Sequence, residues 1–84
     1  MTGRERDLML HAIGGKAHMV PWRNRFCADC DGEDFRVWAG LAAAGLAIGQ
    51  PYGLAPGMWV FYVTRKGLQA LCDAETREKG MAQP

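Results

Sequence analysis

Two cysteines separated by two residues, Cys27 and Cys30, form the one motif in this sequence that is associated with site chemistry. A structural zinc ion usually has four cysteine or histidine ligands in a tetrahedral array. The other such side chains belong to Cys72, His11 and His18, whose spacing forms no second pair. Dithiol redox chemistry would require a helix N-terminus that stabilises a thiolate, and the neighbouring residues are acidic. We therefore predict no bound metal, with Cys27 and Cys30 as the alternative zinc ligands.

Residues for hydrolysis or phosphate transfer do not form a recognisable set. The chain contains no serine, which excludes a serine nucleophile. His11 and His18 could act as bases, but no nucleophile with an orienting partner is placed near them. Gly14, Gly15 and Lys16 lack the spacing and the hydroxyl of a phosphate-binding loop. We predict that the protein is not an enzyme and binds no cofactor.

The length of 84 residues predicts one domain, 1–84, with residues 81–84 as a loose tail. An apolar content of 49% and a net charge of +1 are typical of a folded globular protein without general attraction to nucleic acid. Three cysteines without framework spacing, and no segment that resembles a secretory signal, indicate the cytoplasm.

An uncharged run of 27 residues, Val37 to Val63, raises the possibility of a membrane span. A membrane-spanning helix needs about 20 consecutive apolar residues. Polar residues, glycines and prolines interrupt this run after Ile48, which leaves an apolar stretch of 12 residues. We predict a buried helix there and no contact with a membrane.

The elements that precede this run are two expected helices. Thr2–Ile13 has an N-cap threonine and a stripe of apolar residues, and two consecutive glycines, Gly14 and Gly15, end it. In Met19–Phe26, Pro21 favours the first position of a short helix.

The third expected helix, Glu33–Ala47, has two different faces. Apolar residues at three- and four-residue spacing predict the buried face, which carries Phe35, Trp38, Leu41, Ala42, Gly45 and Leu46. The other face has only Arg36 among small residues, which are Ala39, Gly40, Ala43, Ala44 and Ala47.

Residues 48–63 predict a two-stranded hairpin. Ile48–Gln50 and Met58–Val63 are the strands, and a Pro56-Gly57 turn lies in the loop between them. Alternation places Trp59, Phe61 and Val63 on one side of the second strand. Thr64 then caps a last helix, which ends near Gly80.

About four helices and a hairpin wing predict a small α+β, winged-helix-like domain. PWRNRF, the W-x-x-L-x-x-x-GL pattern of Trp38 to Leu46, and F-x-VT-x-x-G-x-x-x-L from Phe61 to Leu71 resemble patterns of small phage-encoded proteins. The last pattern also resembles the wing-to-helix junction of bacterial winged-helix regulators. These resemblances cover Pro21 to Leu71, and imply a fold and a phage context but no catalytic residues.

Four carboxylates lie within six residues, Asp29 to Asp34. One interpretation is helix initiation, with Asp31 or Asp34 as N-cap and the other carboxylates facing the helix dipole. The alternative is an exposed acidic recognition patch, formed by Asp29, Asp31, Glu33 and Asp34.

DNA binding is the function that a winged helix suggests, and the cations for it would be Lys16, Arg23, Arg25, Arg36, Arg65 and Lys66. However, the exposed face of the third helix offers only Arg36 for base contacts, the wing has no positive charge, and the acidic cluster would repel phosphates. An uncharged wing with aromatic residues is more typical of a protein interface.

We therefore predict a protein that binds a host protein or complex through the acidic patch and the wing residues Tyr52, Leu54 and Trp59. An inhibitor of a host defence complex in the bacterial cytoplasm, similar to anti-CRISPR proteins, is the concrete form that the phage resemblance implies. A DNA-binding regulator is the alternative. The sequence leaves both a monomer and a homodimer open.

Overall fold

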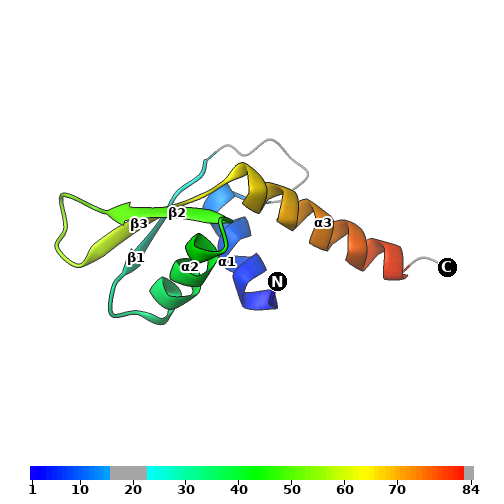
Figure 1. The fold of residues 1–84 in the computed structure, drawn as a ribbon, viewed down its shortest axis with the longest axis horizontal. Coiled ribbons are helices and arrows are strands. Elements are labelled where there is room, and N and C mark those ends of the chain that lie inside the picture. The colour runs from blue at the N-terminus through cyan, green and yellow to red at the C-terminus, as the bar shows by residue number, and fades with distance from the viewer. Residues whose placement is uncertain (16–22, 83–84) are drawn as a thin grey trace.

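The computed structural model describes residues 1–15 and 23–82, and shows a small α+β fold (Figure 1). Within these residues, three helices and a three-stranded antiparallel sheet are formed. In chain order the elements are α1 (Gly3–Ile13), β1 (Phe26–Asp29), α2 (Glu33–Ala43), β2 (Ala47–Pro51), β3 (Met58–Val63) and α3 (Arg65–Ala82). The general class agrees with the prediction, while the number of helices and strands differs.

The strand β1 replaces the end of the short helix that was expected over Met19–Phe26. Residues 23–25 have no regular structure and Phe26 begins the strand, whereas residues 19–22 lie outside the described part of the chain. Phe26 lies opposite Phe61 of β3, and its half-buried ring packs against the core. Pairing with a distant strand therefore gives Phe26 an extended conformation in place of the expected helical one.

The sheet has the order β1-β3-β2, so β3 lies in the centre and pairs with both neighbours in antiparallel fashion. The predicted hairpin is present, and its second strand has the expected bounds, Met58–Val63. The prediction of a two-stranded wing was wrong, because β1 adds a third strand along the other edge of β3.

The hydrophobic core lies on one face of the sheet, where α1 and α2 pack (Figure 1). The predicted inward side of β3 is confirmed, since Phe61 and Val63 are buried and Trp59 packs against the same cluster. Ten buried residues form this cluster, namely Met9, Ala12, Ile13, Ala28, Trp38, Leu41, Ala47, Phe61, Val63 and Leu71.

Trp38 of α2 lies in the centre of this core. Its indole ring is fully buried and stacks on Phe61, with ring centroids 5.5 Å apart and an interplanar angle of 19°. The ring of Phe26 lies 5.4 Å away, which joins β1 to the same aromatic group. Trp38 and Leu41 confirm the predicted buried face of α2, whereas Gly45, which was expected on the same face, is exposed and lies beyond the end of the helix.

The helix α2 ends at Ala43, four residues before the predicted end. Gly45 adopts a left-handed conformation (φ 80°), and the amide of Leu46 donates to the carbonyl of Leu41 at 2.9 Å. This is the bond that closes a Schellman cap, which stops a helix because glycine tolerates positive φ. Ala47 consequently begins β2 and is buried, so it does not belong to the exposed face of small residues.

The junction between β3 and α3 explains the VT-x-x-G pattern in physical terms. The Thr64 hydroxyl accepts a hydrogen bond from the amide of Gly67 at 3.0 Å, as an N-cap does, and donates to the carbonyl of Gly45 at 2.7 Å. A Cβ atom on Gly67 would overlap the carbonyl oxygen of Leu46. Glycine at this position therefore allows α3 to lie directly against the α2–β2 turn.

The chain ends of the fold differ in how well they were predicted. Thr2 caps α1 as expected, in a capping box with Glu5, and Gly14 closes the helix with φ 87°. At the other end, α3 includes Met81 and Ala82, which were expected in a loose tail, and residues 83–84 lie outside the described part of the chain. No helix among the described residues is long and apolar enough to cross a membrane.

Candidate functional site

The acidic cluster lies where β1 turns into α2. Asp29 ends β1, Asp31 lies in the turn, and Glu33 begins α2, and all three are exposed. The Asp29 carboxylate accepts a hydrogen bond from the backbone amide of Asp31 at 2.9 Å, which fixes the turn. The expectation that Asp31 or Asp34 caps α2 was wrong, because Gly32 occupies the N-cap position without a side-chain hydrogen bond.

Asp34 is the carboxylate of the cluster that has an ion-pair partner on another element. Its Oδ1 atom lies 2.5 Å from Nη2 of Arg4 in α1. Both side chains are more than a third exposed, and exposed ion pairs stabilise folded proteins by at most about 1 kcal/mol. The pair therefore reduces the negative charge at this end of α2 and contributes little to stability.

The two motif cysteines are placed differently. Cys27 lies on β1 and Cys30 lies in the following turn, and both are exposed free thiols. Within the described residues, the group of potential ligand atoms within 4.8 Å of one another consists of Cys30, Asp29 and Asp31, and does not include Cys27. Exposed acidic groups of this kind are common without a metal, so we assign no metal to them.

The hairpin loop presents the other predicted partner residues. Leu54 is 86% exposed and Tyr52 is 36% exposed. The loop is held by backbone hydrogen bonds, including those from Tyr52 to Met58 and from Met58 to Ala55, at 2.8 Å and 3.1 Å. The apolar side chain of Leu54 is therefore exposed to solvent at the tip of a hydrogen-bonded loop.

Trp59, the third predicted wing residue, belongs largely to the core. Its ring makes an edge-to-face contact with Phe35 at 5.6 Å and stacks near Phe61 at 6.4 Å. The side chain is partly buried by these contacts. Only its remaining exposed edge is available to a partner.

The acidic turn and the hairpin loop lie side by side at one end of the molecule (Figure 1, left). The amide of Cys30 donates to the carbonyl of Gly57 at 2.8 Å, and Asp29 lies opposite Met58 in the sheet register. We call this surface, formed by Asp29, Asp31, Glu33, Tyr52 and Leu54, the acidic–apolar end. The sequence predicted its two parts separately, and the pairing of β1 with β3 brings them together.

The predicted nucleic-acid-binding residues are divided among several places. Arg25 precedes β1, while Arg65 and Lys66 follow β3, so these three lie at the end of the sheet opposite the acidic–apolar end. Arg36 is exposed on α2 by itself, and Lys16 lies outside the described residues.

Two of these cations already bind helix ends. The guanidinium of Arg23 donates to the carbonyl of His11 at 2.7 Å, and the ammonium of Lys66 donates to that of Ala44 at 3.1 Å. Such contacts satisfy the last carbonyls of α1 and α2 and interact favourably with the helix dipoles. They give these two cations a structural role in the fold.

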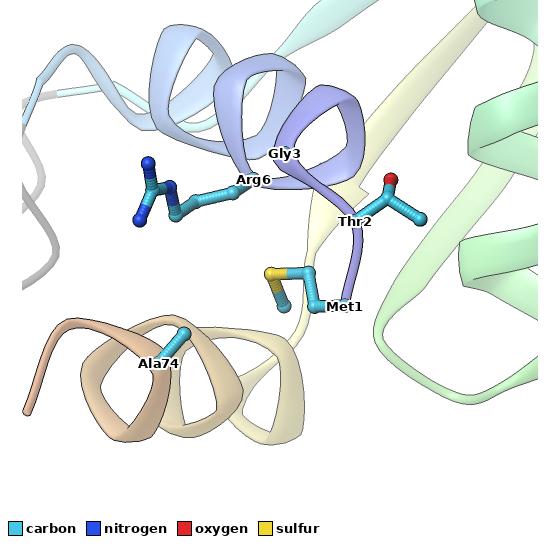
Figure 2. A pocket seen from close by; sticks show the side chains of 5 residues that line it. All are labelled: Met1, Thr2, Gly3, Arg6 and Ala74. Atoms are coloured by element: carbon cyan, nitrogen blue, oxygen red, sulfur yellow. The ribbon is translucent and has the colours of Figure 1, made fainter. Parts of the chain in front are cut away.

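Among the described residues, one pocket is small and another is an open groove. Figure 2 shows the small pocket between the start of α1 and α3, lined by Met1, Thr2, Gly3, Arg6 and Ala74. Its volume of about 80 Å³ is far below the roughly 300–1,000 Å³ of ligand sites. An open groove lies beside α3, lined by Leu46, Arg65, Lys66, Gln69, Ala70 and Asp73.

The acidic–apolar end thus combines exposed carboxylates, an exposed leucine and a fixed loop, and it is the surface of the described residues best suited to binding. Its composition matches an interface in which an apolar contact is surrounded by charges. Comparisons of the chain with models of protein families, with curated proteins and with solved structures found no match.

Proposed function

We propose that this chain is a non-enzymatic binding protein that acts through protein–protein contact at the acidic–apolar end. The observation that carries the proposal is the hydrogen bond between Cys30 and Gly57, which joins the acidic turn to the loop that exposes Leu54. A leucine that is 86% exposed on an ordered loop has no role in the core of this chain. It is suited to insertion into a partner.

The charge of this end indicates the kind of partner. Asp29, Asp31 and Glu33 are exposed, and they complement a basic surface such as one that binds nucleic acid. A phage-encoded inhibitor of a host defence complex, similar to anti-CRISPR proteins and acting in the bacterial cytoplasm, is the form of the proposal that fits such a target. Occupying the nucleic-acid-binding surface of the target would block its function.

A winged-helix-like description is the finer fold assignment that we propose. It is supported by the direct succession of α2, the β2–β3 hairpin and the Thr64-capped α3. The exposed face of α2, however, presents Arg36 beside Ala39 and Gly40, and lacks the amide and guanidinium groups that read bases. We therefore assign this fold a protein partner.

The test is capture of bacterial host proteins on the immobilised chain, with a matched pair of charge reversals. Asp31→Lys with Glu33→Lys changes two exposed carboxylates in the acidic–apolar end. Asp7→Lys with Asp73→Lys makes the same change in net charge on α1 and α3. We expect the first pair to lose at least about 90% of the captured protein, because opposite charges guide such contacts, and the second pair to retain it.

A second substitution tests the apolar part. Leu54→Lys should also abolish capture, whereas Ile48→Lys, on an exposed strand residue elsewhere, should leave it unchanged. Equal capture by the wild type and by the Asp31 and Glu33 variant would contradict the proposal.

DNA binding is the second candidate, supported by the position of Arg25, Arg65 and Lys66 at one end of the sheet. Titration of random duplex DNA with salt tests it. Each neutralised phosphate adds about 0.9 to the slope of log K against log salt, so three contacts give a slope near −2.7. Absence of binding at low salt would end this candidate.

A further inference from the structure

The face of the sheet opposite the core carries a second set of side chains. Strand alternation and register place seven residues on this outer sheet face, namely Cys27, Asp29, Ile48, Gln50, Met58, Val60 and Tyr62. In Figure 1, α1 and α2 lie on the other side of the sheet. Ile48 is 59% exposed, and Val60 is only 3% exposed although it lies outside the core cluster. The outer sheet face therefore exposes an apolar side chain at Ile48 on β2, while Val60 at its centre is already covered by side chains of the same chain.

The register arranges this face in rows that cross the strands. Cys27, Val60 and Gln50 form the middle row. The row on one side contains Asp29 and Met58, which pair with each other, and the row on the other side contains the pair of Ile48 and Tyr62. Arg25 directly precedes β1 and is exposed, and continuing the alternation by this one residue puts it beside the last row. A carboxylate and a guanidinium thus lie at opposite ends of the face, each two residues from Cys27.

This pattern is self-complementary. A two-fold axis that crosses the strands along the middle row would place β1 of one copy antiparallel to β1 of another. Arg25 of each copy would then face Asp29 of the other along β1, and the apolar side chains of β2 and β3 would meet beside these pairs. An axis that runs along β1 itself would instead place Arg25 against Arg25 and Asp29 against Asp29, which is unfavourable.

We propose that two copies of this chain associate through their outer sheet faces, about a two-fold axis through the row of Cys27, Val60 and Gln50. The interface is isologous, so the contact between Arg25 and Asp29 occurs twice. Asp29 also belongs to the acidic–apolar end, whereas Asp31, Glu33 and Leu54 lie outside the dimer contact. Self-association goes beyond the proposed function, and either can fail without the other.

The size of the face predicts the strength of the dimer. Three strands about 4.8 Å apart, with about five residues each, outline roughly 250 Å². Stable interfaces bury roughly 800 Å² on each partner. We therefore expect weak, concentration-dependent association, with a dissociation constant between about 10 µM and 1 mM at low salt.

Sedimentation equilibrium of the full chain up to about 1 mM tests the association. We expect Ile48→Lys to remain a monomer, because it places a cation in the apolar rows on both sides of the axis. Leu54→Lys, at the hairpin tip, should dimerise as the wild type does. Far-UV circular dichroism checks that both variants are folded. A wild type that is monomeric throughout, or an Ile48→Lys variant that dimerises normally, would overturn the proposal.

Charge exchange tests the orientation of the two copies. Asp29→Arg and Arg25→Asp should each weaken self-association at least about tenfold, because each creates like-charge pairs across the axis. A mixture of the two variants should associate at least as strongly as the wild type, because every pair is then opposite in sign. A mixture no stronger than either variant alone would exclude this arrangement, even if the wild type dimerises.

Thiol cross-linking tests the position of the axis. Facing sheets lie about 10 Å apart, so two Cys27 thiols on the axis are within reach of a short bis-maleimide. In a variant with Cys30→Ala and Cys72→Ala, we expect a covalent dimer. In the control with Cys27→Ala and Cys72→Ala, the Cys30 thiols lie roughly 20 Å apart along the strands and should not be joined. Equal yields from the two variants would contradict the proposed axis.

Discussion

The side-chain amide of Asn24 binds both backbone groups of Val63. Its Nδ2 atom donates to the Val63 carbonyl and its Oδ1 atom accepts from the Val63 amide, each at 2.8 Å. Because Phe26 pairs with Phe61, residue 24 is the next hydrogen-bonding position of the β1–β3 ladder. The side chain of Asn24 thus takes the place of a strand residue, and connects the segment before β1 to the end of β3.

Substitution of Asn24 should therefore destabilise the fold. Asn24→Ala leaves the amide and carbonyl of Val63 without their partners in a part-buried position, which costs about 1–3 kcal/mol. Urea unfolding, followed by circular dichroism, measures this loss.

The variant Asn24→Asp tests the two hydrogen bonds independently of each other. An introduced carboxylate can accept from the Val63 amide but cannot donate to its carbonyl, whereas the protonated acid can do both. We expect the unpaired Val63 carbonyl and the partial burial of this position to raise the pKa of the introduced carboxyl above its unfolded value, against the opposing hydrogen bond from the Val63 amide. The variant should therefore be relatively more stable below the unfolded pKa and lose this stability as the pH rises through the folded pKa. Parallel pH dependence in wild type and variant would contradict this account.

Two helical glycines should respond to alanine with opposite signs. Gly67→Ala would force a Cβ atom against the Leu46 carbonyl and within 2.8 Å of the Val63 Cγ1 atom, so we expect a loss of about 2–3 kcal/mol. A Cβ atom on Gly40 would have no neighbouring atom within 4 Å, and this glycine lies on the exposed face of α2. Gly40→Ala should stabilise the protein by about 0.5–1 kcal/mol. Thermal unfolding of both variants decides whether the close approach of α3 causes the difference.

The elements with strong local signals were predicted well. The alternation and β-branched or aromatic residues of Met58–Val63 define β3 to the residue, and the Thr2 cap with the glycines at 14 and 15 defines α1. At the junction, Thr64 is recognisable as a cap from the sequence. The contact that requires Gly67 is not, because its partner is the distant carbonyl of Leu46.

The strand β1 could not be predicted by the same means. It has four residues, of which only Ala28 is fully buried, so its alternation is too short to recognise. Pro21 provided a competing helix signal nearby. Since β1 carries the acidic turn to the hairpin, the acidic–apolar end could be predicted as two separate patches and not as one surface.

The capping box of α1 should make stability depend on pH. The hydrogen bond from the Thr2 backbone amide lowers the pKa of Glu5 below its ordinary value of 4.5. A lowered folded-state pKa means that the stabilisation is complete above the unfolded pKa and is lost as the pH falls through the folded pKa. Glu5→Gln keeps a capping side chain without a titrating group. Between about pH 6 and pH 3, the melting temperature of this variant should change less than that of the wild type.

The indole N–H of Trp38 has no hydrogen-bond partner among the residues that the structure describes, although the side chain is fully buried. Trp38→Phe would remove this donor and keep a ring against Phe61. The decrease in the free energy of unfolding should therefore be much smaller for Trp38→Phe than for Trp38→Ala. For the alanine variant we expect about 3–5 kcal/mol, since it leaves a large cavity. Urea unfolding of both variants measures the difference. Similar losses would show that packing of the indole outweighs its unsatisfied donor.

Removal of Arg4 should strengthen the binding of a basic partner while changing the stability of the fold only slightly. Arg4 pairs with Asp34 at 2.5 Å, and the exposure of both side chains limits the loss in Arg4→Ala to less than about 1 kcal/mol. The substitution exposes one more uncompensated carboxylate beside Glu33, so a basic partner captured by the acidic–apolar end should bind more tightly at low salt. Arg65→Ala makes the same change in net charge at the opposite end of the sheet and should leave this affinity unchanged. The gain should disappear at about 0.5 M salt, where the screening length is only about 4 Å. If both variants bound the partner more tightly by the same factor, the effect would come from net charge and not from the position of Asp34.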